Sequence, residues 1–436
     1  MKQVTPLLAA AILLFATQGF ATTTKSDTLT LSLLQAQEYA IQHSLTVKDA
    51  SYDLEAAKKR VWESTAIGFP QANASLSYSY NPGSLPSIQF SPDSAAVPIG
   101  TKSSTNVTGT VSQLIFSGSY IVGLQAAKTY KQMVNQALQS TQVDVRVAVA
   151  QSYYLVLLTH QTSAVLARNR GNLQKMLDDT QKMFEKGFVE ETAVDQLRLA
   201  VNEVELAIAT TQRQEQVARR LLCYQLGMDV NAAVKLTDAL DAIVQGINRE
   251  RIVETPFDIN HNISYQMVLT QEKVKKLLYR LEVASYLPTV SGFYQYQRYL
   301  KRQSFNFQPE NMLGLSVQLP VFSSGQRLAK VGQAKIAYYK AQNAVESTSR
   351  ALTLQYQQLR DDFNTAWEKY QNSKRSLVLA QKVFDDVSVK YANGMASSMD
   401  LTQANDKLQQ AIATLYGVQF DLLNAKLQLD KVTSNI

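Results

Sequence analysis

The residues that could carry chemistry are few in this chain and lie far apart. The 436-residue sequence has three histidines and a single cysteine, Cys223. His43, His160 and His261 are widely separated, and their spacing does not match that of paired metal ligands, so we expect surface positions on helices or loops. Residues 100–103 (Gly-Thr-Lys-Ser) resemble half of a phosphate-binding loop, but the preceding glycine spacing is missing. The sequence therefore predicts a protein that is not an enzyme, with no catalytic residue, no metal site and no cofactor.

The first residues of the chain have the features of an export signal. Lys2 supplies a positive charge, residues 7–15 form a short apolar stretch, and residues 19–21 place small side chains where signal peptidase cleaves. The alternative is a membrane anchor, but a spanning helix needs about 20 apolar residues. We therefore predict a signal peptide over residues 1–21. The position of Cys223 excludes a lipid anchor on an N-terminal cysteine.

The charge pattern does not favour binding to nucleic acid. The net charge is +7 at pH 7, but the basic residues are scattered and interleaved with acidic ones. The largest basic groups, at residues 58–60, 219–220 and 273–276, suit the solvated faces of helices.

Proline placement predicts two very long helices. No proline occurs between residues 99 and 255 or after residue 320, and four of the ten fall within residues 81–102. Because proline breaks helix interiors, residues 119–185 and 325–391 can each run as one helix, roughly 100 Å long at 1.5 Å per residue. Residues 143–147 alternate locally like a strand, but the context favours helix.

The first long helix has two apolar flanks, which a simple coiled coil would not need. One comprises Val143, Val147, Ala150, Tyr154 and Leu158, and the other Val145, Val149, Tyr153 and Val156. Such a helix suits a wall in which each member has neighbours on both sides.

Four short segments alternate between apolar and polar residues with the period of a strand. They are residues 72–80, 106–112, 289–299 and 313–319. Their length is about that of a membrane-spanning strand with one lipid-facing and one lumen-facing side. A soluble layer of hairpins is the alternative. No segment after the signal is apolar enough for a membrane-spanning helix, so residence in a membrane would depend on these strands.

The chain contains an internal duplication. Each copy reads helix, strand, loop, strand, long helix, tight turn, helix. The matching segments are residues 69–72 with 287–290, 112–118 with 319–325, and 184–187 with 391–394. Both long helices follow strands directly, so we expect all four strands at one pole of the molecule and both helical turns at the other.

The duplication divides the mature chain into two repeats. The first, residues 22–254, is expected to hold a helix, strands at about 72–81 and 105–116, a long helix 119–185, a turn 186–191, a helix 192–226 and a collar from 227. The second, residues 255–436, is expected to hold a helix 257–285, strands at about 288–299 and 311–321, a long helix 325–391, a turn 392–398 and a helix 399–431.

Four strands are too few to close a barrel around a lumen, since about eight are needed. An open sheet edge in lipid would leave backbone groups without hydrogen bonds. The strands must therefore be shared among copies. Two copies would give eight strands and three would give twelve, and these considerations do not choose between them.

The motifs that recur in the two repeats resemble those of a known family. Three features are similar to TolC-type outer-membrane efflux proteins: the proline before each first strand, the turns Phe-Ser-Gly at 116–118 and Phe-Ser-Ser-Gly at 322–325, and the Tyr-x-x-Gly pattern at 391–394 with Asp400 and Leu401. The similarity runs from about residue 31 to 429. It implies an α+β membrane protein: a homotrimer with a 12-stranded transmembrane β-barrel, four strands per chain, continued by a long periplasmic α-helical barrel. Residues 227–262 would form the equatorial collar.

The resemblance also implies the function and the partners. The protein would be the exit duct of a tripartite efflux or type I secretion system in the Gram-negative outer membrane. It would receive substrate from an inner-membrane pump through a periplasmic adaptor protein. A periplasmic coiled-coil adaptor is the main alternative, although it would not need four strands at one pole. A secreted enzyme on a helical scaffold would need a group of polar catalytic residues, which the sequence lacks. Drug efflux and protein secretion are not separated by the sequence.

The two helical turns are the expected docking tips for the adaptor. Gly187 and Gly394 can adopt the left-handed conformation that ends a helix, with Phe188 and Met395 beside them. At the opposite pole, the proline-rich residues 81–102 predict an extracellular loop.

The resemblance implies a periplasmic gate that uses Tyr391 and Asp400. Asp400 follows the Gly394 turn closely, so a role in stabilising the start of a helix is the alternative. The sequence departs from the best-known family pattern. The departures are Ala396 in place of an arginine latch, Gln403 in place of a second aspartate, and Ala193, with Asp195 two residues on, at the equivalent position in the first repeat. We therefore expect a latch that is weaker or built differently.

Overall fold

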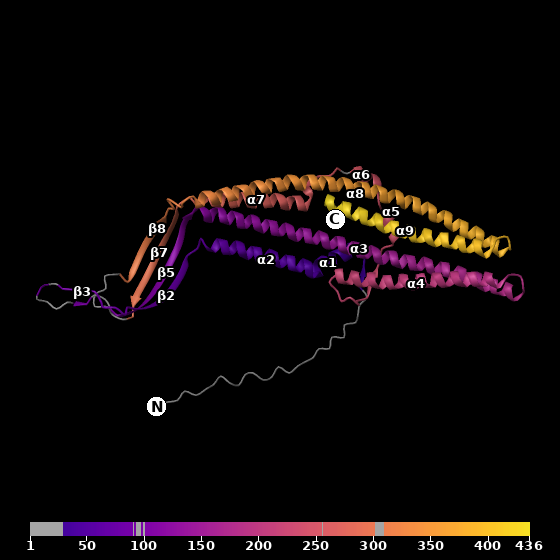
Figure 1. Cartoon of the computed structure of the whole chain (residues 1–436), viewed down its shortest axis with the longest axis horizontal. Coiled ribbons are helices and arrows are strands. Elements are labelled where there is room, and N and C mark those ends of the chain that lie inside the picture. The colour runs from indigo at the N-terminus through magenta and orange to yellow at the C-terminus, as the bar shows by residue number, and fades with distance from the viewer. Residues whose placement is uncertain (1–28, 90, 93–96, 99–100, 255, 301–308) are drawn as a thin grey trace, which may run out of the picture.

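The molecule is long and narrow, with strands at one end and helical turns at the other (Figure 1). The computed structural model describes residues 29–436 except 90, 93–96, 99–100, 255 and 301–308. The expected signal peptide lies outside the described residues. The chain passes twice through the same sequence of elements, and its C-terminus lies midway along the helices (Figure 1).

Four strands form one antiparallel sheet. In sheet order they are β2 (Gln71–Tyr80), β5 (Ser103–Ser117), β7 (Thr289–Tyr299) and β8 (Asn311–Gln318). The pairing of β5 with β7 joins the first repeat to the second. Strands β2 and β8 are the two edges, and neither edge is paired with a further strand within the described part of the chain.

The two faces of the sheet differ in chemistry. Ala72, Val111, Tyr294 and Leu313 lie opposite one another along one row of the register. The adjoining row, which points to the other face, is Asn73, Thr110, Gln295 and Met312. On that face the side-chain amide of Gln297 donates to the Tyr299 hydroxyl at 2.9 Å. One face therefore suits lipid, and the other suits a hydrated lumen.

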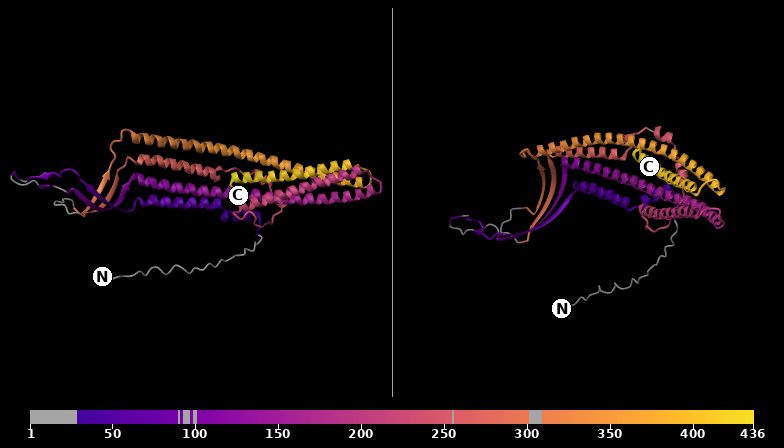
Figure 2. Two further views of the ribbon diagram at one scale, coloured as in Figure 1. Left: turned by 60° about the horizontal axis from the view of Figure 1, so that its bottom comes forward. Right: turned by 45° about the vertical axis from the view of Figure 1, so that its right-hand side comes forward.

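Four helices continue the strands in a single layer (Figure 2). Helix α2 (Leu45–Ala66) precedes β2, and α3 (Gly118–Glu185) follows β5. Helix α7 (Ile263–Ala284) precedes β7, and α8 (Gln326–Ala392) follows β8. Beyond the ends of α2 and α7, the layer is completed by α4 (Glu191–Gln225) and α9 (Ser398–Thr433), which run back from the tips. None of the helices within the described ranges combines the length and the apolar character needed to cross a membrane.

The central part of α3 is the main core-forming segment. Val145, Val149, Tyr153 and Val156 of one expected flank are buried, as are Val147, Ala150 and Tyr154 of the other. Both apolar flanks therefore pack, because α3 has neighbours on both sides: α2 and α7 towards the sheet, and α4 and α9 towards the tips. The local alternation at 143–147 gives no strand, because this segment belongs to a helix of 68 residues.

A collar crosses the helices at mid-length. It contains β1 (Leu29–Leu31) paired in parallel with β6 (Val234–Leu236), together with α1 (Leu33–His43), α5 (Leu240–Gln245) and α6 (Arg249–Glu254). Its anchor is the fully buried Tyr153, whose hydroxyl donates to Asp238 Oδ2 at 2.9 Å. The same carboxylate oxygen accepts the Leu33 backbone N–H at 2.7 Å. Burial and the Asp238 carboxylate raise the pKa of Tyr153, so the hydroxyl remains a donor.

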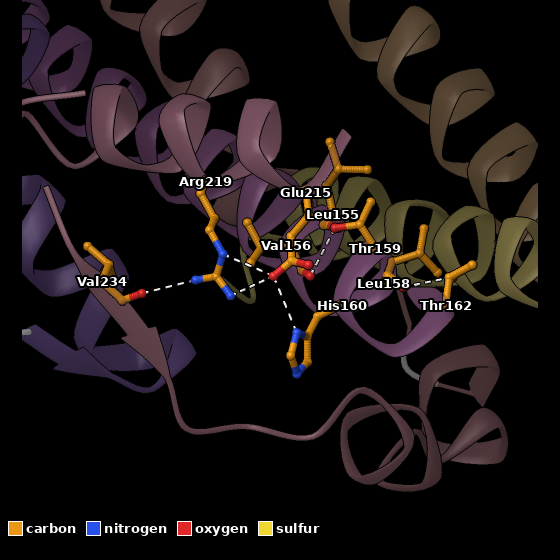
Figure 3. A network of polar contacts seen from close by, with 9 residues as sticks. All are labelled: Leu155, Val156, Leu158, Thr159, His160, Thr162, Glu215, Arg219 and Val234. Carbon is orange, nitrogen blue, oxygen red and sulfur yellow. Dashed lines mark hydrogen bonds and ion pairs between the residues drawn. The ribbon is translucent and has the colours of Figure 1, made fainter. Parts of the chain in front are cut away.

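A second polar network ties the collar to α3 and α4 (Figure 3). The Arg219 guanidinium donates to Glu215 through Nε and Nη2, and through Nη1 to the Val234 carbonyl of β6. His160 on α3 lies 3.3 Å from the same Glu215 oxygen. His160 is thus an exposed partner of a carboxylate, and within the described residues no group of metal-binding side chains is found.

Two expected element boundaries differ from the structure by three residues or more. The helix expected from residue 257 begins at Ile263, because Asn262 caps it by accepting the N–H groups of Ser264 and Tyr265. The strand expected to reach residue 321 ends at Gln318, two residues before Pro320, which has no N–H to donate to a ladder. Within the expected loop 81–102, which is described only in part, β3 (Ser87–Ile88) pairs with β4 (Val97–Pro98).

Candidate functional site at the helical tips

Both tips end in the same glycine turn. The Gly187 N–H donates to the Phe184 carbonyl, and the Phe188 N–H reaches back to the Met183 carbonyl at 2.9 Å. In the second repeat the Met395 N–H donates to the Lys390 carbonyl at 2.8 Å. This pattern requires a left-handed residue, and the φ values are +76° at Gly187 and +70° at Gly394. A Cβ at either glycine would meet nothing within 4 Å, so the backbone conformation itself calls for glycine.

The residue after each glycine presents a large apolar side chain to solvent. Phe188 is 77% exposed and Met395 is 70% exposed. Both side chains directly follow the hydrogen-bonded glycine of a turn.

Tyr391 links the two long helices close to the tips. Its hydroxyl lies 3.0 Å from the Thr180 hydroxyl, so α8 is tied to α3. Thr180 is only 1% exposed, which shields this hydrogen bond from water. The tie joins the first repeat to the second within one chain, near the end of α3.

Asp400 caps the start of α9 in the single chain. It forms a capping box with Ser397: the Ser397 Oγ accepts the Asp400 N–H at 3.1 Å, and Asp400 Oδ2 accepts the Ser397 N–H at 2.9 Å. The Ser397 hydroxyl also donates to Asp400 Oδ2 at 2.7 Å, and this hydrogen bond, together with that from the Ser397 N–H, holds the pKa of Asp400 below its ordinary value. The contribution of the charged cap is therefore fully present above the ordinary aspartate pKa and is lost only as the pH falls through the lowered pKa.

The first repeat lacks the corresponding cap. Glu190 is the N-cap residue of α4 and makes no side-chain capping hydrogen bond. Ala193 occupies the position equivalent to Asp400, and Asp195 instead pairs with Arg198 at 2.8 Å. The two tips thus share the glycine turn, but only α9 begins with a side-chain cap.

A groove of about 860 Å³ runs between α3 and α8 just above the tips. Its wall includes Phe188, Phe384 and Val389 as apolar residues, with Tyr391 and Thr180 beside them. Charged residues of both signs complete the lining: Lys175, Lys182, Lys186, Asp179 and Asp385.

The structure thus brings Phe188 and Tyr391 to one groove, whereas Met395 and Asp400 lie outside its lining. Two residues of this region were missed by sequence reasoning. Ser397 was visible, because Ser-x-x-Asp before an apolar helix is a capping signal. Thr180 gave no signal, because its pairing with Tyr391 depends on how α3 and α8 pack.

Comparison with known proteins agrees with this architecture. The family model described as "Outer membrane efflux protein" matches residues 37–227 and 272–435. The chain is 22% identical over 414 residues to the proteases secretion protein PrtF of Dickeya chrysanthemi, covering 92% of this chain and 87% of that protein. It is 20% identical over 445 residues to the outer membrane protein TolC of Vibrio cholerae, covering 98% and 94%.

Among solved structures, the fold matches the outer membrane protein VceC of Vibrio cholerae. The TM-score is 0.73 at 16% sequence identity, and the match covers 92% of this chain and 95% of that one. The match to the family model spans both repeats, including the two long helices and both tips. This chain therefore belongs to the outer membrane efflux protein family and is a protein of the outer membrane.

Proposed function

We propose that three copies of this chain close one continuous duct through the outer membrane and the periplasm, and that the duct is the exit of a tripartite efflux or secretion system. The observation that carries the proposal is the four-stranded sheet, which has an apolar face, a polar face and, among the described residues, two unpaired edges. In a membrane such edges would leave backbone groups without partners, at several kcal/mol each. Pairing between copies removes both edges at once.

The number of copies follows from the width that a duct needs. Two copies would give a barrel of eight strands, and side chains would nearly fill its interior. Three copies give twelve strands and leave room for a lumen lined by the polar face. The long helices would continue the wall in the same order as the strands that they follow.

The tips are proposed to meet a periplasmic adaptor protein, which in turn would contact an inner-membrane pump. Support comes from exposed Phe188 and Met395 on hydrogen-bonded glycine turns and from the groove between α3 and α8. Apolar anchors beside a groove suit helical partners, which insert side chains at helical spacing. The family is named for efflux and one relative for protease secretion, so the proposed duct serves an exporter of either kind.

The tips are also proposed to be the gate. Tyr391 would hold α8 against α3 in the closed state, and breaking this tie would let the tips part. Three copies of the exposed Asp400 would form an acidic ring at the entrance, in addition to the capping role in each chain. Such a ring would favour cations.

Planar bilayer recordings test the proposal. Purified protein should insert and give discrete single-channel conductance steps. A correctly folded oligomer that never conducts, with its gate opened by substitution as described below, would contradict the role as a duct and favour a periplasmic adaptor.

A further inference from the structure

The two repeats correspond residue by residue on the sheet side. Helices α2 and α7 have 22 residues each, and their N-caps are Ser44 and Asn262. The same alignment matches Gln71, the first residue of β2, with Thr289, the first residue of β7.

The hairpin registers extend this correspondence to the second strand of each repeat. Gln71 lies opposite Ser112, and Thr289 lies opposite Gln318. Ser112 therefore corresponds to Gln318, one residue earlier than the Leu319 that the sequence comparison suggested. The second repeat has its extra residue in the turn before Gly325, since Phe116 then corresponds to Phe322.

The junction between the repeats inside one chain is a template for the junction between chains. Within the chain, β5 meets β7 with Val111 opposite Tyr294. In a ring of identical chains, β8 meets β2 of the next copy, and these strands correspond to β5 and β7. Val317 corresponds to Val111, and Leu76 corresponds to Tyr294.

We propose that β8 pairs antiparallel with β2 of a second copy in the register that places Val317 opposite Leu76, Leu315 opposite Tyr78 and Leu313 opposite Tyr80. This seam rests on the proposed closed oligomer and specifies how its copies join.

The chemistry of the two edges agrees with this register. The six side chains of the proposed pairs are all exposed in the single chain, from 60% at Tyr80 to 83% at Leu313. The register places apolar against apolar on the face that suits lipid. On the other face it places Ser316 opposite Ser77. A shift of the register by one residue would place the apolar side chains of β8 on the same face as the polar side chains of β2. A shift by two would preserve the faces, so the internal template is what selects the register.

Paired cysteine substitutions test the seam. The double variants Ser77→Cys with Ser316→Cys, and Leu76→Cys with Val317→Cys, are oxidised in the full-length protein in outer membranes and run on non-reducing gels. Neighbouring opposed pairs alternate between Cα separations of about 5.5 Å and 4.5 Å. Both fall within the range that a disulfide spans, and the two double variants sample one pair of each kind. Residues 77 and 316 lie on opposite edges of their own sheet, about 14 Å apart across three strand spacings. Their rows cross β7 at Tyr299 and Ser291, so they are also offset by eight residues, roughly 26 Å, along the strands, and a disulfide can form only between copies.

The matched control is Ser77→Cys with Met312→Cys. Met312 lies four residues from Ser316 on the same face, about 13 Å along the strand. The wild type and the single variants control for Cys223, which is buried. We expect reducible dimers and trimers for at least one proposed pair and none for the control.

Two results would overturn the register: linkage in the Met312 control, or no linkage in either proposed pair while native mass spectrometry still shows three copies. Loss of the oligomer in the wild-type protein itself would instead overturn the proposed function, and the seam with it.

Discussion

Removing one hydroxyl at the tips should make the proposed gate easier to open. Tyr391→Phe deletes the group that lies 3.0 Å from the Thr180 hydroxyl and keeps the ring that packs in the groove. A neutral hydrogen bond contributes a net of about 0.5–1.5 kcal/mol. With three copies opening together, the closed state would lose about 3 kcal/mol, and each 1.4 kcal/mol is tenfold in an equilibrium constant. We therefore expect the open-to-closed ratio to rise roughly a hundredfold.

The assay is open probability in planar bilayers, with Tyr339→Phe as the matched control. Tyr339 also lies on α8, is 48% exposed and is remote from the tips. Its loss of a hydroxyl should leave gating unchanged.

A double-mutant cycle isolates the tie itself. Thr180→Val should open the gate about as much as Tyr391→Phe, and the double variant should add little to either, because both remove the same hydrogen bond. Fully additive effects, or wild-type gating in Tyr391→Phe, would refute the role of this contact.

Three further results are expected at the tips. Ser397→Ala removes an N-cap worth about 1 kcal/mol. Amide hydrogen exchange in the first turn of α9, measured by mass spectrometry, should therefore accelerate about fivefold. The control Glu190→Ala removes no side-chain cap and should leave exchange in α4 unchanged. Asp400→Asn should lower cation selectivity and weaken block by multivalent cations added from the periplasmic side; unchanged selectivity and block would restrict Asp400 to capping. Cysteines at Phe188 or Met395 should crosslink to the adaptor in cells, and failure at both with assembly intact would count against docking there.

Much of the fold is readable from the sequence because its strongest determinants are local. The absence of proline permits a helix of 68 residues and another of 67, and both are present. Alternation identifies the strands, since a half-exposed strand must separate its two faces. The glycine turns are visible because the left-handed conformation strongly favours glycine.

What the sequence misses depends on contacts between distant segments. The Tyr391–Thr180 tie needs α8 packed beside α3, which no local pattern reveals. Helix α7 begins six residues later than its composition predicts, because Asn262 caps it by accepting the N–H groups of Ser264 and Tyr265. Sequence similarity matches Ser112 with Leu319, whereas the hydrogen-bond registers match Ser112 with Gln318. The difference arises because the second repeat has one extra residue in the turn, and sequence similarity alone does not locate it.

The most direct measurement of the central claim is native mass spectrometry of the mature protein released from detergent. The described residues form four membrane-type strands with two unpaired edges, so the protein should appear as three copies and should dissociate only with heating. A stable monomer, or a complex of two copies, would contradict the account.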